Sequence, residues 1–186
     1  VFADFEDYPY YIQRDWTEYK PQVGDFIRSA LIRGMQIEQE IGLNPYQFGV
    51  IGSTDSHTGL SAAEENNFHG KFATDSRPSL KQLGWSDNAN SSFGWAMGAQ
   101  GLAAVWAEEN TRESIMQAMK RRETYATTGS RIGLRFYGGY DLDASALESS
   151  AFPYESSGAV PMGGELYPKE GSAPVFLVHA MADPKS

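Results

Sequence analysis

The chain has 186 residues, of which 41% are hydrophobic and 13% aromatic, and it carries a formal net charge of −9 with a pI near 4.8. This length and apolar content exclude a disordered chain and predict a folded protein with a sizeable core. The negative charge opposes binding to nucleic acid and to anionic membrane surfaces, no apolar run is long enough for a membrane helix, and the lack of cysteine excludes disulfides.

The first predicted element is an amphipathic helix over residues 25–41, DFIRSALIRGMQIEQEI. Its largely apolar stripe recurs with helical spacing, and Asp25 is expected to be its N-cap. Gly42 then ends the helix. Residues 48–52, FGVIG, form a short apolar run of the kind that parallel sheets bury on both faces. A helix followed by a buried strand predicts an α/β unit, whose functional groups lie past the carboxyl end of the strand.

The middle of the chain alternates between weak and strong signals. A short helical turn is predicted over residues 58–67, and a long polar stretch over residues 70–101, whose tryptophans favour an ordered loop. Residues 102–107, LAAVWA, predict a buried strand. A second helix is predicted over RESIMQAMKRR, with Asn110 and Glu113 as its capping box.

The last third of the chain is predicted to be rich in β-structure. The segment ETYATTGS, residues 123–130, is interpreted as a junction, and residues 131–139 alternate in polarity as a half-exposed strand does. Residues 173–182, APVFLVHAMA, predict another strand. The domains predicted from this change in character are residues 1–128 and residues 129–186.

The segment FGVIGSTDSHTG contains two residues of types that bind metal ions, Asp55 and His57. In an extended segment, residues two positions apart point to the same side, so these two side chains can converge on one point. A carboxylate oxygen and an imidazole nitrogen together suit zinc, manganese or iron. The pattern is short, and it also fits an aspartate that caps the following turn beside a histidine with an ordinary hydrogen bond. The small neighbouring residues and the position after a strand favour the metal site.

The longer segment NPYQFGVIGSTDSHTGLSAAEENNFHGK resembles the DUF3604 family, a branch of the PHP-like metallohydrolases that includes the CehA/McbA-type carbamate hydrolases. The resemblance continues through RRETYATTGSRIGLRFYGGYDL and APVFLVHAMADP, and so covers nearly the whole chain. It implies a distorted β/α barrel with two or three metal ions, in which Asp55 and His57 match the final metal motif. The motifs with which PHP proteins begin do not occur, so the chain resembles a C-terminal fragment whose other ligands lie outside it.

The expected fold class is therefore α/β, with the C-terminal part of a PHP-like barrel followed by a β-rich segment. Glu64, Glu65 and His69 could orient a metal ligand, although a solvent-exposed helix face and a surface histidine are the competing interpretations. Arg131 could contact an anionic substrate or form a structural ion pair, and His179 is expected to be structural. No residue is predicted to act as a catalytic acid or base.

The function implied by the resemblance is metal-dependent hydrolysis of a phosphoester, or of a related ester, amide or carbamate, by a metal-activated water. The expected substrate is a small molecule, and the expected cofactor is divalent zinc, manganese or iron, completed by ligands outside the chain. The alternative is a non-catalytic scaffold or interaction module, or a fragment that is inactive by itself. A cytoplasmic and an exported location both fit the sequence, which indicates no oligomeric state.

Overall fold

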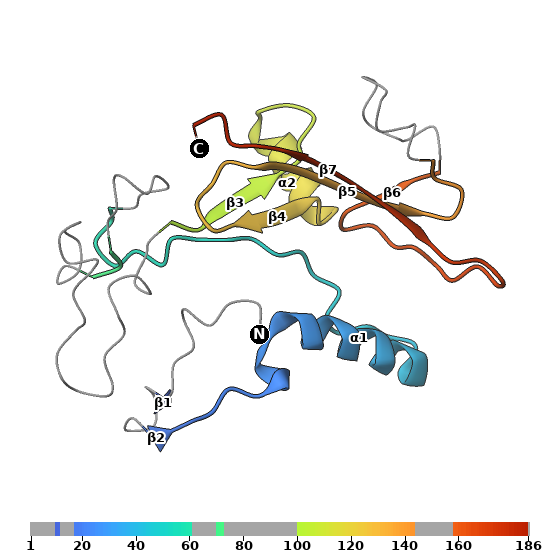
Figure 1. Ribbon diagram of the computed structural model, residues 1–186, viewed down its shortest axis with the longest axis horizontal. Helices are drawn as coiled ribbons and strands as arrows, with labels where there is room; N and C mark the ends of the chain where they lie inside the picture. Colours follow the sequence, from blue (N-terminus) through green and yellow to red (C-terminus); the bar gives the residue numbers. More distant parts are fainter. Residues whose placement is uncertain (1–9, 12–16, 61–69, 73–99, 144–157, 186) are drawn as a thin grey trace. The chain divides into compact units, whose positions relative to one another are not determined.

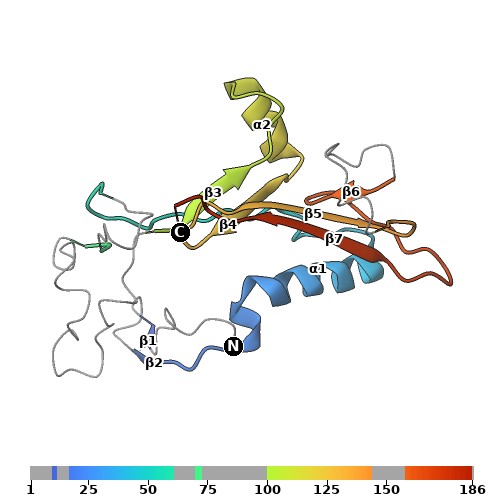
Figure 2. The same ribbon diagram turned by 45° about the horizontal axis from the view of Figure 1, so that its top comes forward.

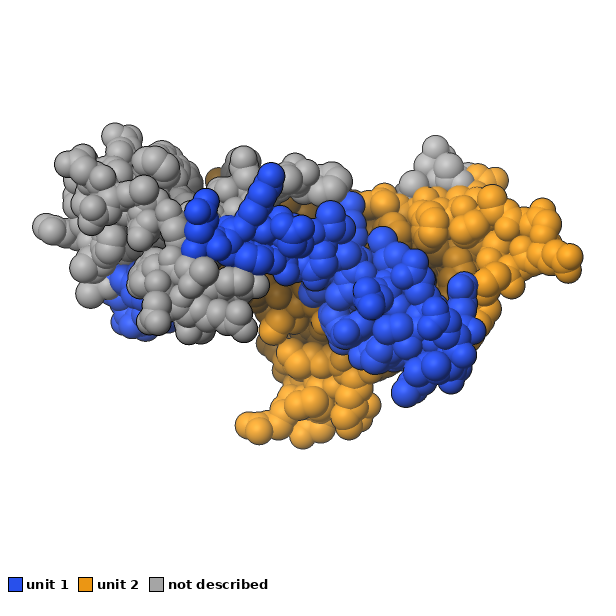
Figure 3. Space-filling model, turned by 90° about the horizontal axis from the view of Figure 1, so that it is seen from below, with its two compact units in different colours: residues 1–48, 54–100 blue, residues 49–53, 101–186 orange. Residues whose placement is uncertain are grey.

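The computed structural model describes residues 10–11, 17–60, 70–72, 100–143 and 158–185. The chain divides into two compact units (Figure 3), unit 1 with residues 1–48 and 54–100 and unit 2 with residues 49–53 and 101–186. The described residues contain both helices and strands, and the strands form small antiparallel sheets (Figure 1). None of the helices among them is long and apolar enough to span a bilayer.

The main element of unit 1 is helix α1, Ile27–Ile41, which confirms the helix predicted from the amphipathic pattern. It ends at Gly42, whose φ of +76° gives the left-handed C-cap that glycine adopts without steric cost. On the helix itself Gly34 is buried, because the side chains of Asn44 and Tyr46 fold back over it. Unit 1 also contains the antiparallel strand pair β1 and β2, Tyr10–Tyr11 and Thr17–Glu18.

The prediction that Asp25 caps α1 is wrong by one residue. The N-cap is Phe26, which makes no side-chain hydrogen bond, and Asp25 instead closes the preceding 3-10 turn η2, Val23–Asp25. The carboxylate of Asp25 accepts hydrogen bonds from the hydroxyl of Tyr19 and from the backbone N–H of Gln22. These two hydrogen bonds hold the pKa of Asp25 below its usual value, since they favour the charged form.

Residues 48–52 do not form the predicted buried strand. Phe48 and Ile51 are exposed, and the segment has no strand partner among the described residues. Residues 49–53 instead lie in unit 2 against the hairpin of β3 and β4, where a Cβ on Gly52 would come within 2.5 Å of the backbone oxygen of Leu102. The glycines of the apolar run therefore permit a close approach between backbones. A short run of apolar residues and glycines can serve this purpose as well as form a strand, so its composition alone does not distinguish the two.

The hairpin of unit 2 pairs β3, Leu102–Val105, antiparallel to β4, Thr124–Thr127. Helix α2, Arg112–Lys120, joins them, so the predicted strand and the predicted second helix are both confirmed. The strand is not buried as expected, because its residues are partly or fully exposed. The N-cap of α2 is Thr111 rather than Asn110, because the Thr111 hydroxyl accepts a hydrogen bond from the backbone N–H of Ser114 at 3.3 Å. The strand β4 falls in the segment interpreted as a junction and was not predicted as a strand.

A three-stranded antiparallel sheet forms the rest of unit 2 (Figures 1 and 2), with β5 between β6 and β7. The strands β5, Gly133–Gly139, and β7, Val175–Met181, confirm the two strands predicted in this region, and β6, Val160–Pro161, adds two residues. Tyr137 and Leu177 lie opposite each other in the register and are each only 5% exposed, so they form the core of this sheet.

Two ring side chains join the hairpin to the start of β5. The indole N–H of Trp106 donates to the backbone oxygen of Leu134 at 2.7 Å. The hydroxyl of Tyr125 donates to the backbone oxygen of Ile132 at 2.8 Å and accepts from the N–H of Leu134 at 3.2 Å. The segment ETYATTGSRI therefore connects the hairpin to β5. Its tyrosine, Tyr125, hydrogen bonds to the residues just before and just after Gly133, the first residue of that strand.

The barrel expected from the resemblance receives no support from the described residues, whose strand pairs are all antiparallel. Parallel pairs are what a β/α barrel requires. Apart from residues 49–53, the chain passes from unit 1 to unit 2 between residues 100 and 101, whereas the predicted domain boundary lies between residues 128 and 129. The hairpin and α2 thus share a unit with the β-rich segment, and the assignment of residues 1–128 and 129–186 to two domains stays a prediction.

A clamp centred on Arg122 holds the loop after β6. Arg122 follows α2 with a left-handed φ of +62°, and its Nε donates to the backbone oxygen of Gly163 at 2.8 Å. Its Nη2 lies 3.2 Å from a carboxylate oxygen of Glu165. Gly163 has a φ of +83°, and a Cβ there would lie 2.3 Å from the backbone oxygen of Arg122. The close contact between two backbones requires a glycine at this position.

We expect Gly163→Ala to lower the free energy of unfolding by about 2–4 kcal/mol, since it combines a strained φ with a backbone clash. Gly171→Ala is the matched control, because Gly171 has a φ of +72° and no atom lies within 4 Å of the position that an added methyl group would take. That variant should lose only about 1 kcal/mol, the cost of the backbone conformation alone. Denaturant unfolding of both variants measures the difference, and equal losses would contradict the clamp.

Candidate functional site

Asp55 and His57 converge in unit 1. Oδ1 of Asp55 lies 3.4 Å from Nε2 of His57, and the two side chains are 62% and 51% exposed. The one-residue spacing predicts this approach, but the backbone achieves it differently from the expected extended strand. Asp55 has a φ of +50°, so the chain bends through the left-handed region at the aspartate itself. Aspartate tolerates that region better than most residues.

A third side chain, that of Lys71, completes the cluster, and it was not identified from the sequence. Its Nζ lies 3.2 Å from Oδ2 of Asp55, and its side chain is only 4% exposed. A buried ammonium needs an anionic or strongly polar partner, since burial removes its hydration. The two carboxylate oxygens of Asp55 therefore face different groups, the imidazole of His57 on one side and the ammonium of Lys71 on the other.

The backbone also ties these residues together. The N–H of His57 donates to the backbone oxygen of Lys71 at 2.7 Å, and the ring of His57 meets the ring of Phe72 edge-on with centroids 4.4 Å apart. The turn that follows is closed by the hydroxyls of Ser56 and Thr58, which donate to the backbone oxygen of Leu60. The hydrogen bonds that close this turn thus come from hydroxyl groups, and not from the carboxylate of Asp55 acting as a cap.

The donor pair fits two ligands of one metal ion. Two donor atoms that each lie about 2.0–2.2 Å from a tetrahedral ion are about 3.3–3.6 Å apart. The 3.4 Å between Oδ1 of Asp55 and Nε2 of His57 falls within that interval. Among the residues that the structure describes, no group of three or more His, Asp or Glu side chains is arranged to hold a metal. A metal centre built on this pair therefore needs further ligands from outside the described residues.

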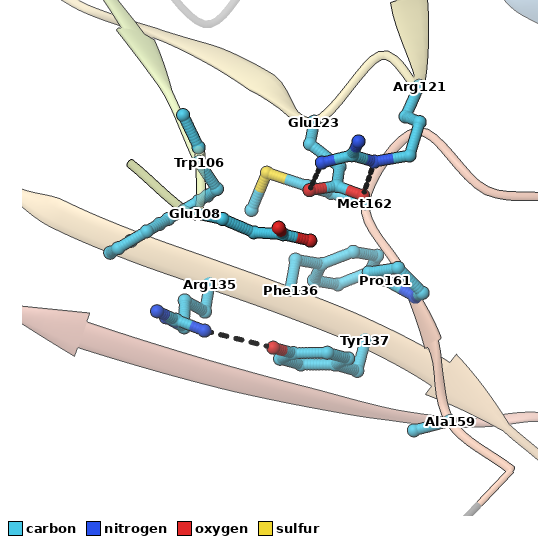
Figure 4. A pocket seen from close by; sticks show the side chains of 11 residues that line it. Trp106, Glu108, Arg121, Glu123, Arg135, Phe136, Tyr137, Ala159, Pro161 and Met162 are labelled. Carbon is cyan, nitrogen blue, oxygen red and sulfur yellow. Dashed lines mark hydrogen bonds and ion pairs between the residues drawn. The ribbon is translucent and has the colours of Figure 1, made fainter. Parts of the chain in front are cut away.

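Unit 2 contains a cavity of about 560 Å³ beside β5 (Figure 4). Arg121 reaches over its wall to Glu123 with two hydrogen bonds of 2.8 and 3.3 Å, which raise the pKa of the guanidinium above its ordinary value. Arg135 lies 3.9 Å above the ring of Trp106, and its Nη1 donates to the hydroxyl of Tyr137 at 3.4 Å. Both guanidinium groups are thus engaged by neighbouring side chains.

The remaining charged side chain of the cavity is Glu108, which projects into the hollow between these two walls (Figure 4). The volume is of the order found in small-molecule sites. The lining comes from segments distant in sequence, the end of β3, the end of α2 and the strands β5 and β6, so no local motif indicated it. Both cations of the cavity are paired within its wall, and the described residues of its lining offer Glu108 no histidine as a second metal ligand, so the aspartate–histidine pair remains the better candidate.

A family model described as "Protein of unknown function (DUF3604)" matches residues 1–186. The chain belongs to the DUF3604 family. Searches of curated proteins and of solved structures found no match to it. Membership in DUF3604 confirms the resemblance at the level of the family, and the printed description of that family assigns no activity.

The structure does not test the other residues predicted for the site of this DUF3604 chain. Glu64, Glu65 and His69 lie outside the described residues. Arg131 lies in unit 2, where its backbone N–H donates to Oδ2 of Asp183 at 2.7 Å. That hydrogen bond is the main reason why the pKa of Asp183 is lower than usual, and the charge of Arg131 acts in the same direction. Contact between Arg131 and a substrate stays a prediction.

His179 lies in β7, opposite Arg135 in the register with β5. It is part of a regular ladder, in the same unit as the β-rich segment and not in the unit of Asp55 and His57. The expectation from the sequence, a histidine within a strand after the predicted domain boundary, agrees with this placement.

Proposed function

We propose that this DUF3604 chain supplies Asp55 and His57 to the metal centre of a PHP-like hydrolase of the CehA/McbA-type branch. The observation that carries the proposal is the 3.4 Å separation of Oδ1 of Asp55 and Nε2 of His57, which suits two ligands of one ion. The reaction is hydrolysis of a phosphoester, or of a related ester or carbamate, in a small-molecule substrate. The other ligands come from outside the described residues, and the fold that holds them is the distorted β/α barrel implied by the resemblance.

The two residues bind the ion and do not act as acid or base. Asp55 offers a negatively charged oxygen, and His57 offers a neutral nitrogen, a donor set that suits zinc, manganese or iron. When bound, such an ion polarises the scissile group and lowers the pKa of a coordinated water toward neutrality. The contact with Phe72 and the backbone hydrogen bond to Lys71 fix where the His57 ring lies, so that little reorganisation is needed for it to bind.

A non-catalytic scaffold or interaction module is the alternative function. It is favoured by one observation, that the described residues bring only two metal-type ligands together. Metal content and chelation separate the two functions. A protein that contains this chain and the complete domain should retain a transition metal and lose hydrolysis of a phosphoester or carbamate ester after chelator treatment, whereas a scaffold should do neither.

The 186-residue chain alone is expected to bind zinc or manganese weakly and to be nearly inactive. The described residues bring only two metal-type ligands together, fewer than the three or four that protein zinc sites use. Elemental analysis after gel filtration, with a chelator titration, measures the retained metal. Tight binding of one metal per chain would contradict this expectation.

A further inference from the structure

We propose that Lys71 is a positioning residue that holds Asp55 in place, so that the carboxylate offers a single oxygen beside His57 and the site favours a compact nitrogen–oxygen coordination. The inference rests on the proposed metal site and goes beyond it, because it assigns Lys71 a role in setting which ion binds. The observation behind it is the division of the two oxygens of Asp55 between His57 and Lys71.

The first step of the argument is geometric. Oδ2 of Asp55 lies 3.2 Å from the ammonium of Lys71, while Oδ1 lies 3.4 Å from Nε2 of His57. Bidentate binding requires one metal ion to contact both oxygens of the carboxylate. The ammonium of Lys71 lies against Oδ2 and so competes with a metal ion for that oxygen. The carboxylate can then bind a metal through Oδ1 alone, on the side where the imidazole lies.

The second step concerns what holds Lys71. Its side chain is buried, in contrast to the exposed carboxylate that it pairs with, and its backbone oxygen accepts the hydrogen bond from the N–H of His57. Lys71 therefore contacts the aspartate through its side chain and the histidine through its backbone. Because Asp55 adopts a left-handed φ of +50°, an additional contact that fixes its side chain also stabilises an uncommon backbone conformation.

The third step concerns the ion. Zinc uses four ligands in a compact tetrahedron of nitrogen, oxygen and sulfur donors, whereas manganese shares with calcium and magnesium a preference for oxygen-rich coordination of higher number. A carboxylate limited to one oxygen suits the first arrangement. A carboxylate free to use both oxygens suits the second. Lys71 therefore shifts the preference of the pair toward zinc.

The test uses the 186-residue chain with Lys71→Met, which removes the charge at similar length, and Lys71→Arg, which keeps it. The matched control is Lys169→Met, since Lys169 pairs with Asp141 at 3.4 Å in an exposed ion pair elsewhere in the chain. NMR signals of the His57 ring, identified with His57→Gln, are measured first without metal. We expect Lys71→Met to displace these signals, and Lys71→Arg and Lys169→Met to leave them near their wild-type positions.

Titration with zinc and with manganese, followed at the signals of Asp55 and His57, is the second measurement. Removing a cation strengthens the binding of both ions, so the ratio of the two dissociation constants isolates the number of oxygens used. In Lys71→Met this ratio is expected to move about tenfold in favour of manganese, the size of effect typical of groups that orient metal ligands. Lys71→Arg should keep the wild-type ratio.

The inference is overturned if the His57 signals of metal-free Lys71→Met do not move, or if the ratio of the two dissociation constants is unchanged in that variant. A variant Lys71→Arg that behaves like Lys71→Met also overturns it, because charge retention would then have no effect. If wild-type His57 responds to neither metal, the proposed function fails for this site, and the metal-free measurement still decides whether Lys71 positions the pair.

Discussion

Replacing His57 with alanine is expected to reduce metal-dependent hydrolysis at least about 100-fold in a protein that contains the complete domain. Losing a ligand weakens metal affinity and removes part of the activation of water, so both effects lower the rate. The melting temperature should change little, because the His57 side chain is about half exposed and its backbone hydrogen bond to Lys71 does not depend on the ring. Rates on a phosphoester and a carbamate ester, with melting curves of both proteins, provide the measurement.

The matched control for this experiment is His69→Ala, which we expect to affect the rate much less than His57→Ala. A structural histidine at position 57 would give the opposite pattern, with lower stability and unchanged activity per folded molecule. Equal hydrolysis by His57→Ala and the parent protein at saturating manganese or zinc would contradict the metal-site proposal. The result would not depend on which ester is the natural substrate, because the metal is required for both.

Regular periodicity allowed the clear elements to be predicted. The apolar stripe of α1 and the alternation of β5 each extend over enough residues to be distinguished from a chance arrangement of apolar residues. The structure confirms both elements. The predicted helix starts were wrong, since two or three polar residues near each start could serve as caps. Asp25 is engaged by Tyr19 and Gln22, and Thr111 is placed one residue closer to α2 than Asn110. Caps depend on such local contacts, which the sequence pattern does not resolve.

The apolar run 48–52 illustrates why short apolar segments are ambiguous. In a five-residue pattern, glycine at positions 49 and 52 favours neither a strand nor another structure. In the fold, a Cβ at either position would collide with Thr124 or Leu102 of the hairpin formed by β3 and β4. The close approach explains the glycines, and a strand ladder does not form at these described residues. The strand β4 was not predicted for a related reason, because its four residues are too few to show alternation and its partner lies on the far side of α2 in the sequence.

The candidate site was predictable as a pair and not as a cluster. Asp55 and His57 lie one residue apart, so their spacing alone indicated convergence. Lys71 is separated from them along the chain, and a lysine after a glycine carries no signal of burial in the sequence. In the same segment His69 is the residue whose type suggests a ligand, because histidine commonly binds metals. The contact with Asp55 comes from the tertiary fold, which brings Lys71 to the bend at residue 55.

The register of the β5–β7 pair predicts a large difference between two neighbouring residues of β7. Leu177 lies opposite Tyr137 and is 5% exposed, with Leu142 and Ala159 packed against the pair. Val178 is the next residue, points to the other face of the sheet and is 52% exposed. A slip of one residue in the register would exchange these two environments.

We therefore expect Leu177→Ala to lower the free energy of unfolding by about 2–5 kcal/mol, through lost burial and the cavity left beside Tyr137. Val178→Ala should change it by less than about 1 kcal/mol, since most of its side chain already contacts solvent. Urea unfolding followed by tryptophan fluorescence suits the measurement in a variant that keeps Trp106 as its one tryptophan, because that indole hydrogen bonds to Leu134 in β5 and reports on this sheet. A loss at Val178 as large as the loss at Leu177 would place the opposite face in the core and overturn the register.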